Sequence, residues 1–176
     1  PIAIAGAFEL APKRYPEDDV GLYRAVLKGA MREWPIRPLD VDGLLTHPSG
    51  GITGYDPYIH DRLISELGLR PTFVETLNLG GATYPAMVNR AAAAIRGGQA
   101  STVLCVAAGK FLKPSAGGGS AMAGAISHRD LEYPYGTFIP ALYGLISSQF
   151  MAERNVTSRD LARVAVSARE WGRRNP

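Results

Sequence analysis

Cysteine is the residue type that this 176-residue sequence has least of, with Cys105 as its single copy. One cysteine excludes an intrachain disulfide framework and a CxxC metal-binding pair. It fits a reducing compartment, so we expect a cytoplasmic protein. Long apolar runs are missing as well, because none approaches the roughly 18 residues that a membrane helix needs. A membrane span is therefore not expected.

A strong excess of charge of one sign is also absent. Basic residues number 19 and acidic residues 16, which gives a formal net charge of +3. This balance is too mild for nucleic acid to be the expected partner. Arg169, Arg173 and Arg174 gather near the carboxyl end, where a solvated helix face explains them better than an anion site. With 46% apolar residues, the composition is that of a globular domain or of half a larger one.

Short apolar runs alternate with segments of helical periodicity along the first 110 residues. The runs predict strands at residues 2–8, 41–47, 73–79 and 102–108. The helical spacing predicts helices at residues 19–34, 57–67 and 82–95, and Gly68 is expected to cap the second. Strands alternating with helices of this length predict an α/β fold, with a mainly parallel sheet and helices on both faces.

Residues 1–110 therefore form the predicted βα core, and the character of the sequence changes after them. Residues 111–136 include three successive glycines at 117–119 and predict a flexible loop region. No GxxxxGK[ST] pattern surrounds these glycines, so phosphate binding is not indicated. Residues 137–176 predict a helical segment with helices at 139–154 and 158–171. Thr157 is the expected N-cap of the second, with Asp160 in a variant of the capping box.

The turn after the third predicted strand is the first place to expect a ligand. Ligands of open α/β sheets bind beyond the carboxyl ends of the strands. Here a strand passes directly into a helix, whose first N–H groups are able to stabilise an anion. The candidate binding residues are Asn78, Gly80, Gly81, Ala82 and Thr83. An equally weighted alternative is that the two glycines only permit a tight turn.

The other candidates for chemistry are isolated from one another. Cys105 falls inside the fourth predicted strand, where burial as a small apolar residue is expected rather than a nucleophilic role. His47 ends the second strand and is placed to face the cleft, whereas His60 is expected on a helix surface and His128 in a mobile segment. Because no histidine has an evident partner, neither a hydrolase triad nor a metal site is supported.

Residues 74–110 read VETLNLGGATYPAMVNRAAAAIRGGQASTVLCVAAGK and resemble the thiolase segment in which a strand delivers the nucleophile to a buried helix. Thiolases have approximately VN..CGSG..A...A...I..G..D..L..G there, and the comparable small or apolar positions are Asn89, Ala92, Ile95, Gly98, Val103 and Gly109. The opening IAIAGAFEL, the DVDGLL stretch at residues 40–45 and the two final helices resemble the lipid-transfer (sterol-carrier) branch of thiolase-like proteins. This resemblance covers nearly all of the chain.

The resemblance implies a thiolase-like fold in which this chain is the first of two similar halves. It places Gly81 where the family carries its nucleophilic cysteine. Since glycine forms no thioester, thiolytic acyl transfer through that residue is excluded. Cysteine-lacking members of this branch include retro-aldolases that split 3-hydroxyacyl-CoA thioesters. The resemblance therefore implies an acyl-CoA-handling protein of lipid metabolism, with a coenzyme A thioester as substrate, no motif-bound cofactor, and carbon–carbon bond cleavage or formation of the aldol type.

Partners are implied by the resemblance as well. Thiolase-like proteins commonly form homodimers through the strand before the nucleophile turn, here residues 73–78, and the retro-aldolases often work with a small OB-fold partner of the DUF35 type. In thiolases the second half supplies a histidine of a GHP-type motif and usually a second cysteine. Neither motif is present in this chain, so its catalytic residues stay unassigned.

Two expectations concern the extent of the chain and its activity. A chain that begins at Pro1 is expected to have been trimmed, and one that ends at Pro176 either continues or is completed by another polypeptide. The alternative to an enzyme is a catalytically inactive thiolase-like subunit that binds acyl-CoA or scaffolds a partner.

Overall fold

The computed structural model describes residues 1–11, 13–48, 56, 58–110, 123–124, 126–136 and 139–174. The chain divides into two compact units, Pro1–Ala116 and Gly117–Pro176, whereas the sequence predicted boundaries after residues 110 and 136. The glycines at 117–119, predicted to be part of a flexible loop, lie outside the described residues.

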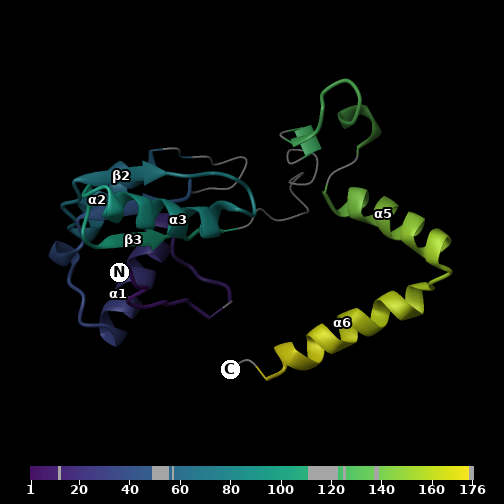
Figure 1. The fold of residues 1–176 in the computed structure, drawn as a ribbon, viewed down its shortest axis with the longest axis horizontal. Coiled ribbons are helices and arrows are strands. Elements are labelled where there is room, and N and C mark those ends of the chain that lie inside the picture. The colour runs from purple at the N-terminus through teal and green to yellow at the C-terminus, as the bar shows by residue number, and fades with distance from the viewer. Residues whose placement is uncertain are drawn as a thin grey trace. The chain divides into compact units, whose positions relative to one another are not determined.

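Unit 1 is built on a parallel sheet (Figure 1). Its strands are β1 (Gly43–Thr46), β2 (Phe73–Thr76) and β3 (Val103–Val106), in the order β2-β1-β3. Its helices are α1 (Asp19–Glu33), α2 (Ile59–Leu67) and α3 (Thr83–Arg96), with a short 3-10 turn, η1 (Pro38–Asp40), before β1. The predicted α/β class with a parallel sheet is confirmed, and this arrangement is compatible with half of a thiolase-like fold.

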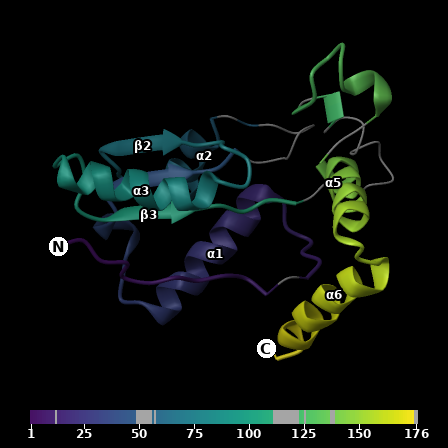
Figure 2. The same ribbon diagram turned by 45° about the vertical axis from the view of Figure 1, so that its right-hand side comes forward.

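The two faces of the sheet bury different side chains, because successive residues of a strand point to opposite faces. The core beneath α1 and α2 consists mainly of Tyr23, Leu27, Leu44, Ile59 and Leu63. The core beneath α3 consists mainly of Leu45, Phe73, Met87 and Ala94. Each fully buried Leu or Ile contributes about 1.5–3 kcal/mol of burial free energy. Helices therefore cover both faces, as predicted. In the view of Figure 2, α3 crosses in front of the strands and most of α1 lies below β3.

The helices of unit 1 start and stop at residues with a local physical reason. Asp18 caps α1, since its Oδ1 accepts a hydrogen bond from the Gly21 N–H at 2.8 Å. Gly68, which follows α2, has a φ of 66°, and Gly98, just after α3, has a φ of 70°. This left-handed region suits glycine because it has no Cβ. The predicted glycine cap of α2 is thus confirmed.

The strand predicted at residues 2–8 is wrong, because the described segment forms no strand. Phe8 packs on α1 instead, and its ring lies 6.5 Å from that of Trp34 in an edge-to-face arrangement. A Cβ at Gly29 would overlap the Phe8 ring, so this glycine makes room for it on the helix. Ile2 and Ile4 are exposed. A strand needs a neighbour for its backbone hydrogen bonds, and the apolar pattern alone does not supply one.

Asp42 joins the three strands at the point where they begin. Its carboxylate accepts hydrogen bonds from the N–H groups of Ser101, at 2.8 Å, and Thr102, at 2.7 Å, just before β3. Its carbonyl accepts from the N–H of Thr72 at 2.8 Å and of Phe73 at 3.2 Å, at the start of β2. Burial acts to raise the pKa of Asp42, but the N–H groups of Thr102 and Ser101 outweigh burial, and this pKa is lowered overall. These N–H groups therefore favour the ionised form of the Asp42 carboxylate.

Replacing Asp42 by alanine is expected to lower the free energy of unfolding by about 2–3 kcal/mol, because two backbone N–H groups lose a charged acceptor. Urea unfolding at neutral pH measures this loss. Glu66→Ala is the control, since Glu66 pairs with Arg24 on the surface and such pairs contribute at most about 1 kcal/mol. Equal losses in the two variants would contradict a special role for Asp42.

The contribution of Asp42 is also expected to depend on pH. A carboxyl group with a lowered pKa in the folded state stabilises the fold above its unfolded pKa of about 3.9, and this stabilisation is lost as the pH falls through the folded pKa. The difference in unfolding free energy between the native chain and Asp42→Asn should therefore be largest near neutral pH and shrink below about pH 4. Unfolding measured across this range tests the expectation, which a pH-independent difference would refute.

The described residues of unit 2 include the helices α5 (Ile139–Arg154) and α6 (Ser158–Gly172) and a 3-10 turn, η3 (Tyr133–Tyr135). Both helices occupy their predicted positions. The predicted capping box is present, and the Thr157 N–H donates to Asp160 Oδ2 at 3.0 Å. Within the described part of unit 2, neither helix has a buried residue, and the apolar side chains that α5 exposes include Leu142, Leu145, Ile146 and Phe150.

Among the described residues, no helix combines the length and the apolar character needed to cross a bilayer.

Candidate functional site

The carboxyl edge of the sheet brings together most of the residues that are able to carry chemistry. Because β1, β2 and β3 are parallel, Thr46, Thr76 and Val106 end their strands at one edge. α2 and α3 both begin after a strand has ended there. Residues in the first turns of these helices therefore lie near the strand ends, as expected for an open α/β sheet.

A closed set of hydrogen bonds holds the turn between β2 and α3. Thr83 is fully buried, and its hydroxyl accepts from the Leu79 N–H at 2.8 Å and donates to the Gly80 carbonyl at 2.7 Å. The Asn78 Oδ1 accepts from the Gly80 N–H at 3.3 Å. Gly80 has a φ of 57°, which favours glycine. Among the five candidate residues, Asn78, Gly80 and Thr83 thus build the turn, and the Thr83 hydroxyl has no proton left for a ligand.

Fewer free N–H groups are present at the start of α3 than the sequence suggested. The Ala82 N–H donates to the Leu79 carbonyl at 3.2 Å, and the Thr83 N–H donates to the Gly80 carbonyl at 3.1 Å. Pro85 has no N–H. Within the described residues, the Tyr84 N–H has no protein acceptor, and it is the backbone donor that this first helical turn leaves free. Ala82 itself is exposed and provides no side-chain cap.

Gly81 differs from its neighbour Gly80 in what the backbone requires. Its φ is outside the left-handed region, and a Cβ built on it would meet no atom within 4 Å. The tight turn therefore explains Gly80 but does not demand a glycine at position 81. Gly81 is exposed, and a side chain there would project into open space at the carboxyl edge. Ligand binding by the five candidate residues stays a prediction.

His47 and Tyr84 meet at this edge, and sequence reasoning did not single out Tyr84. Their ring centroids lie 6.2 Å apart. The His47 carbonyl accepts a hydrogen bond from the Tyr23 hydroxyl at 2.8 Å, and that hydroxyl also accepts from Thr46 Oγ1 at 3.1 Å. Burial raises the pKa of Tyr23, so its phenol stays protonated as a donor. The buried pair of Tyr23 and Thr46 thus fixes the backbone that carries His47.

His60 was expected on a helix surface, and this prediction is wrong. The imidazole is half-buried, and its Nδ1 lies 2.6 Å from Thr76 Oγ1 at the end of β2. Its Nε2 lies 3.5 Å from Asp61 Oδ1. The sequence position of His60 could have predicted this contact, because His60 lies in the first turn of a helix that follows a strand, and such a turn lies at the carboxyl edge of the sheet. His128 is in unit 2, where its Nδ1 accepts from the N–H groups of Asp130 and Leu131 at 3.3 Å.

Cys105 is exposed, which contradicts the expected burial in the core. Leu45 and Cys105 lie on the same face of the sheet, in register across β1 and β3. The apolar cluster beneath α3 includes Leu45, Phe73 and Val103 but does not extend over Cys105 on the outer strand. Desolvation by neighbouring atoms nevertheless raises the pKa of the Cys105 thiol. A protonated thiol is a poor nucleophile, so the structure gives Cys105 no catalytic activation.

Comparisons with known proteins do not add a family to these observations. No protein-family model matches the chain, and a search of curated proteins finds no match either. Within the part of the chain that the structure describes, no three His, Cys, Asp or Glu residues gather in a group able to hold a metal ion. The thiolase resemblance therefore stays an expectation based on the sequence pattern.

Replacing Thr83 by valine is expected to cost about 1–2 kcal/mol of unfolding free energy, because Leu79 loses an acceptor and Gly80 loses a donor while the side-chain shape is kept. Thermal or urea unfolding measures the loss. Thr72→Val is the matched control, since the exposed Thr72 hydroxyl makes only long hydrogen bonds, of 3.2 and 3.3 Å. A Thr83 variant no less stable than the Thr72 variant would show that the turn does not depend on this hydroxyl.

Proposed function

We propose that this chain binds an acyl-CoA thioester at the carboxyl edge of its sheet and takes part in carbon–carbon bond cleavage or formation of the aldol type. The observation that carries the proposal is Gly81. It occupies the position that the thiolase resemblance assigns to the nucleophile, it has no thiol, and the space in front of it is open. An edge arranged in this way favours a substrate held without a covalent bond to the protein.

The state of the cysteine supports a reaction without an acyl-enzyme. A thiolase-type reaction needs a thiolate to accept the acyl group. Gly81 supplies none, and the raised pKa of Cys105 keeps that thiol protonated near neutral pH. Aldol chemistry avoids this requirement, because it needs a general base and a stabilised enolate but no nucleophile.

The described residues fit the cleavage of a 3-hydroxyacyl thioester in two respects. A base takes the proton of the 3-hydroxyl group, the C2–C3 bond breaks with its electron pair moving toward the thioester carbonyl, and protonation at C2 releases acyl-CoA and a carbonyl product. The Tyr84 N–H, which has no acceptor among the described residues, is suited to donate to the thioester oxygen as charge develops there. His47, beside Tyr84, is the imidazole we assign to the hydroxyl proton. The remaining acid and base groups belong to the second half that the resemblance implies.

Assembly with other chains is part of this proposal. β2 is an outer strand of the described sheet, which supports pairing of residues 73–78 with a second copy to form a homodimer. A DUF35-type OB-fold partner follows from the resemblance alone, as does a place in lipid metabolism. A cytoplasmic location is proposed from the single cysteine.

Replacing Gly81 by leucine is expected to weaken binding of a 3-hydroxyacyl-CoA at least about tenfold, because the side chain enters the open space that the thioester would occupy. Isothermal titration calorimetry measures the affinity. Gly81→Ala is the matched control and should stay within about threefold, since a single methyl group occupies little of that space. Neither variant should unfold more easily, because Gly81 is exposed and a Cβ at this position meets no neighbour within 4 Å. Unchanged binding by the leucine variant would exclude this turn as the substrate site.

Product analysis by mass spectrometry then separates the two candidate roles. Release of a carbonyl product and a shorter acyl-CoA supports the aldol enzyme. Binding without consumption, even when an OB-fold partner and a polypeptide with the second half that the resemblance implies are supplied, supports the alternative of an inactive subunit that holds acyl-CoA. The absence of binding to the native chain would reject both.

A further inference from the structure

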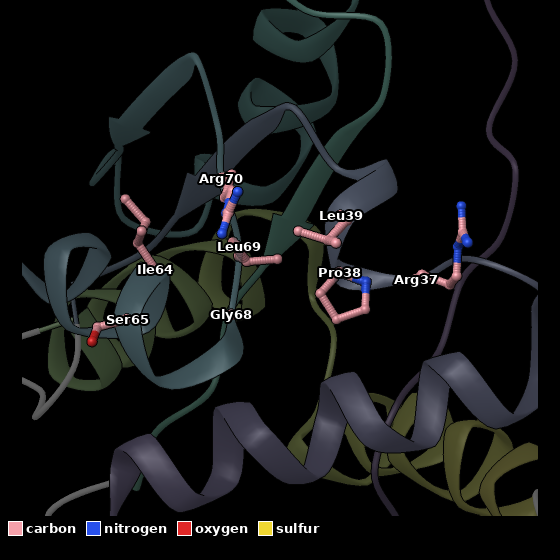
Figure 3. A pocket seen from close by; sticks show the side chains of 8 residues that line it. All are labelled: Arg37, Pro38, Leu39, Ile64, Ser65, Gly68, Leu69 and Arg70. Atoms are coloured by element: carbon pink, nitrogen blue, oxygen red, sulfur yellow. The ribbon is translucent and has the colours of Figure 1, made fainter.

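A groove opens at the amino edge of the sheet, at the other end of the strands from the proposed acyl-CoA site. It lies between η1, which precedes β1, and the turn that joins α2 to β2 (Figure 3). Its volume is about 700 Å³. Pockets that bind small organic molecules have volumes of roughly 300–1,000 Å³, so the groove is large enough for such a ligand.

The walls of the groove are mostly apolar. Pro38 and Leu39 come from η1, Ile64 from the last turn of α2, and Leu69 from the residues that follow it. Leu39 is 67% exposed although it is a large aliphatic residue, whereas Leu69 is buried. An aliphatic side chain exposed to this degree beside other apolar groups offers a surface that an apolar ligand would cover.

Two arginines line the groove, and they differ in how their charge is used. Arg37 pairs with Asp40 through Nη2–Oδ1 at 2.7 Å and Nε–Oδ2 at 3.1 Å. This contact raises the pKa of Arg37 and holds the pKa of Asp40 at about 2, so the pair is neutral as a whole. Arg70 has no hydrogen bond or acidic partner within the described residues. Its guanidinium is therefore available to a ligand.

The carbonyl end of α2 also faces this region and must be counted, since it carries partial negative charge. The N–H groups of Gly68 and Leu69 both donate to the Ile64 carbonyl, the latter at 3.1 Å, which satisfies one of the terminal acceptors. Among the groups that line the groove, Arg70 is the one whose positive charge is not balanced by a described acidic partner. Its planar fork of N–H donors matches a carboxylate in two-point contact.

We infer that this groove binds a small organic carboxylate with an apolar body. The carboxylate pairs with Arg70, and the apolar body covers the exposed Leu39 in the groove that Leu69 also lines. This site is distinct from the Gly81 turn, since it lies at the opposite edge of the sheet, and it does not depend on the proposed acyl-CoA chemistry.

The test uses 4-phenylbutyrate, which joins a carboxylate to an apolar ring, and its neutral amide, 4-phenylbutyramide. Titration of each into the ¹⁵N-labelled chain is followed by NMR at the backbone amides of Leu39, Gly68, Leu69 and Arg70. We expect saturable shifts at these amides with the carboxylate and about tenfold weaker binding of the amide, because the amide keeps the shape but loses the charge-assisted contact.

Arg70→Gln is expected to weaken 4-phenylbutyrate binding about tenfold and to remove the preference over the amide. Arg96→Gln is the matched control, since Arg96 is exposed on α3 and has no acidic partner within the described residues; it should leave the affinity unchanged. Leu39→Asn should weaken both ligands alike, and because Leu39 is largely exposed this change leaves the core intact. Shifts that do not saturate, equal affinity for the two ligands, or an Arg70 variant that binds as the native chain does would each overturn the inference.

Discussion

The carboxylate of Asp42 is the constraint on which the rest of unit 1 depends. Parallel strands are far apart in sequence, so their alignment needs contacts that only the folded chain provides. Asp42 supplies several of them, with its carboxylate bonded to the N–H groups of Ser101 and Thr102 and its carbonyl bonded to Thr72 and Phe73. Because the three strands begin in register and have the same length, they also end in register. Both edges of the sheet, and the surfaces on them, are therefore set by this residue.

The opposite edges of the sheet differ in chemical character. Histidine, tyrosine and threonine side chains, among them His47 and Tyr84, lie at the carboxyl edge near the open space at Gly81. The amino edge has an apolar groove and Arg70, which has no acidic partner among the described residues. Polar groups that exchange protons suit a reaction, whereas a single cation beside apolar walls suits binding alone. One small sheet thus presents two surfaces suited to different tasks.

Local signals in the sequence predicted the helices well, and tertiary contacts explain the misses. Gly68 and the Thr157–Asp160 box mark helix ends through effects that span only a few residues, so they were readable in advance. Residues 2–8 had the apolar pattern of a strand, but whether a neighbouring strand exists is not a local property. His60 and Cys105 were misplaced for the same reason, because the contact with Thr76 and the reach of α3 over β3 depend on the assembled sheet. At the turn between β2 and α3, the sequence predicted which residues form the turn. It did not predict that Thr83 holds the turn by hydrogen bonds while Gly81 faces open space.

The open space at Gly81 also bears on how such a protein changes over evolution. Many active-site residues are embedded in contacts, so exchanging them disturbs the fold together with the chemistry. At Gly81 an added Cβ would meet no neighbour within 4 Å, and the backbone conformation is one that other residues adopt. If the proposed acyl-CoA site lies at this turn, acquiring or losing a nucleophile at position 81 would alter the reaction class at little cost in stability. Selection is thus free to test different chemistries at this position on an unchanged scaffold.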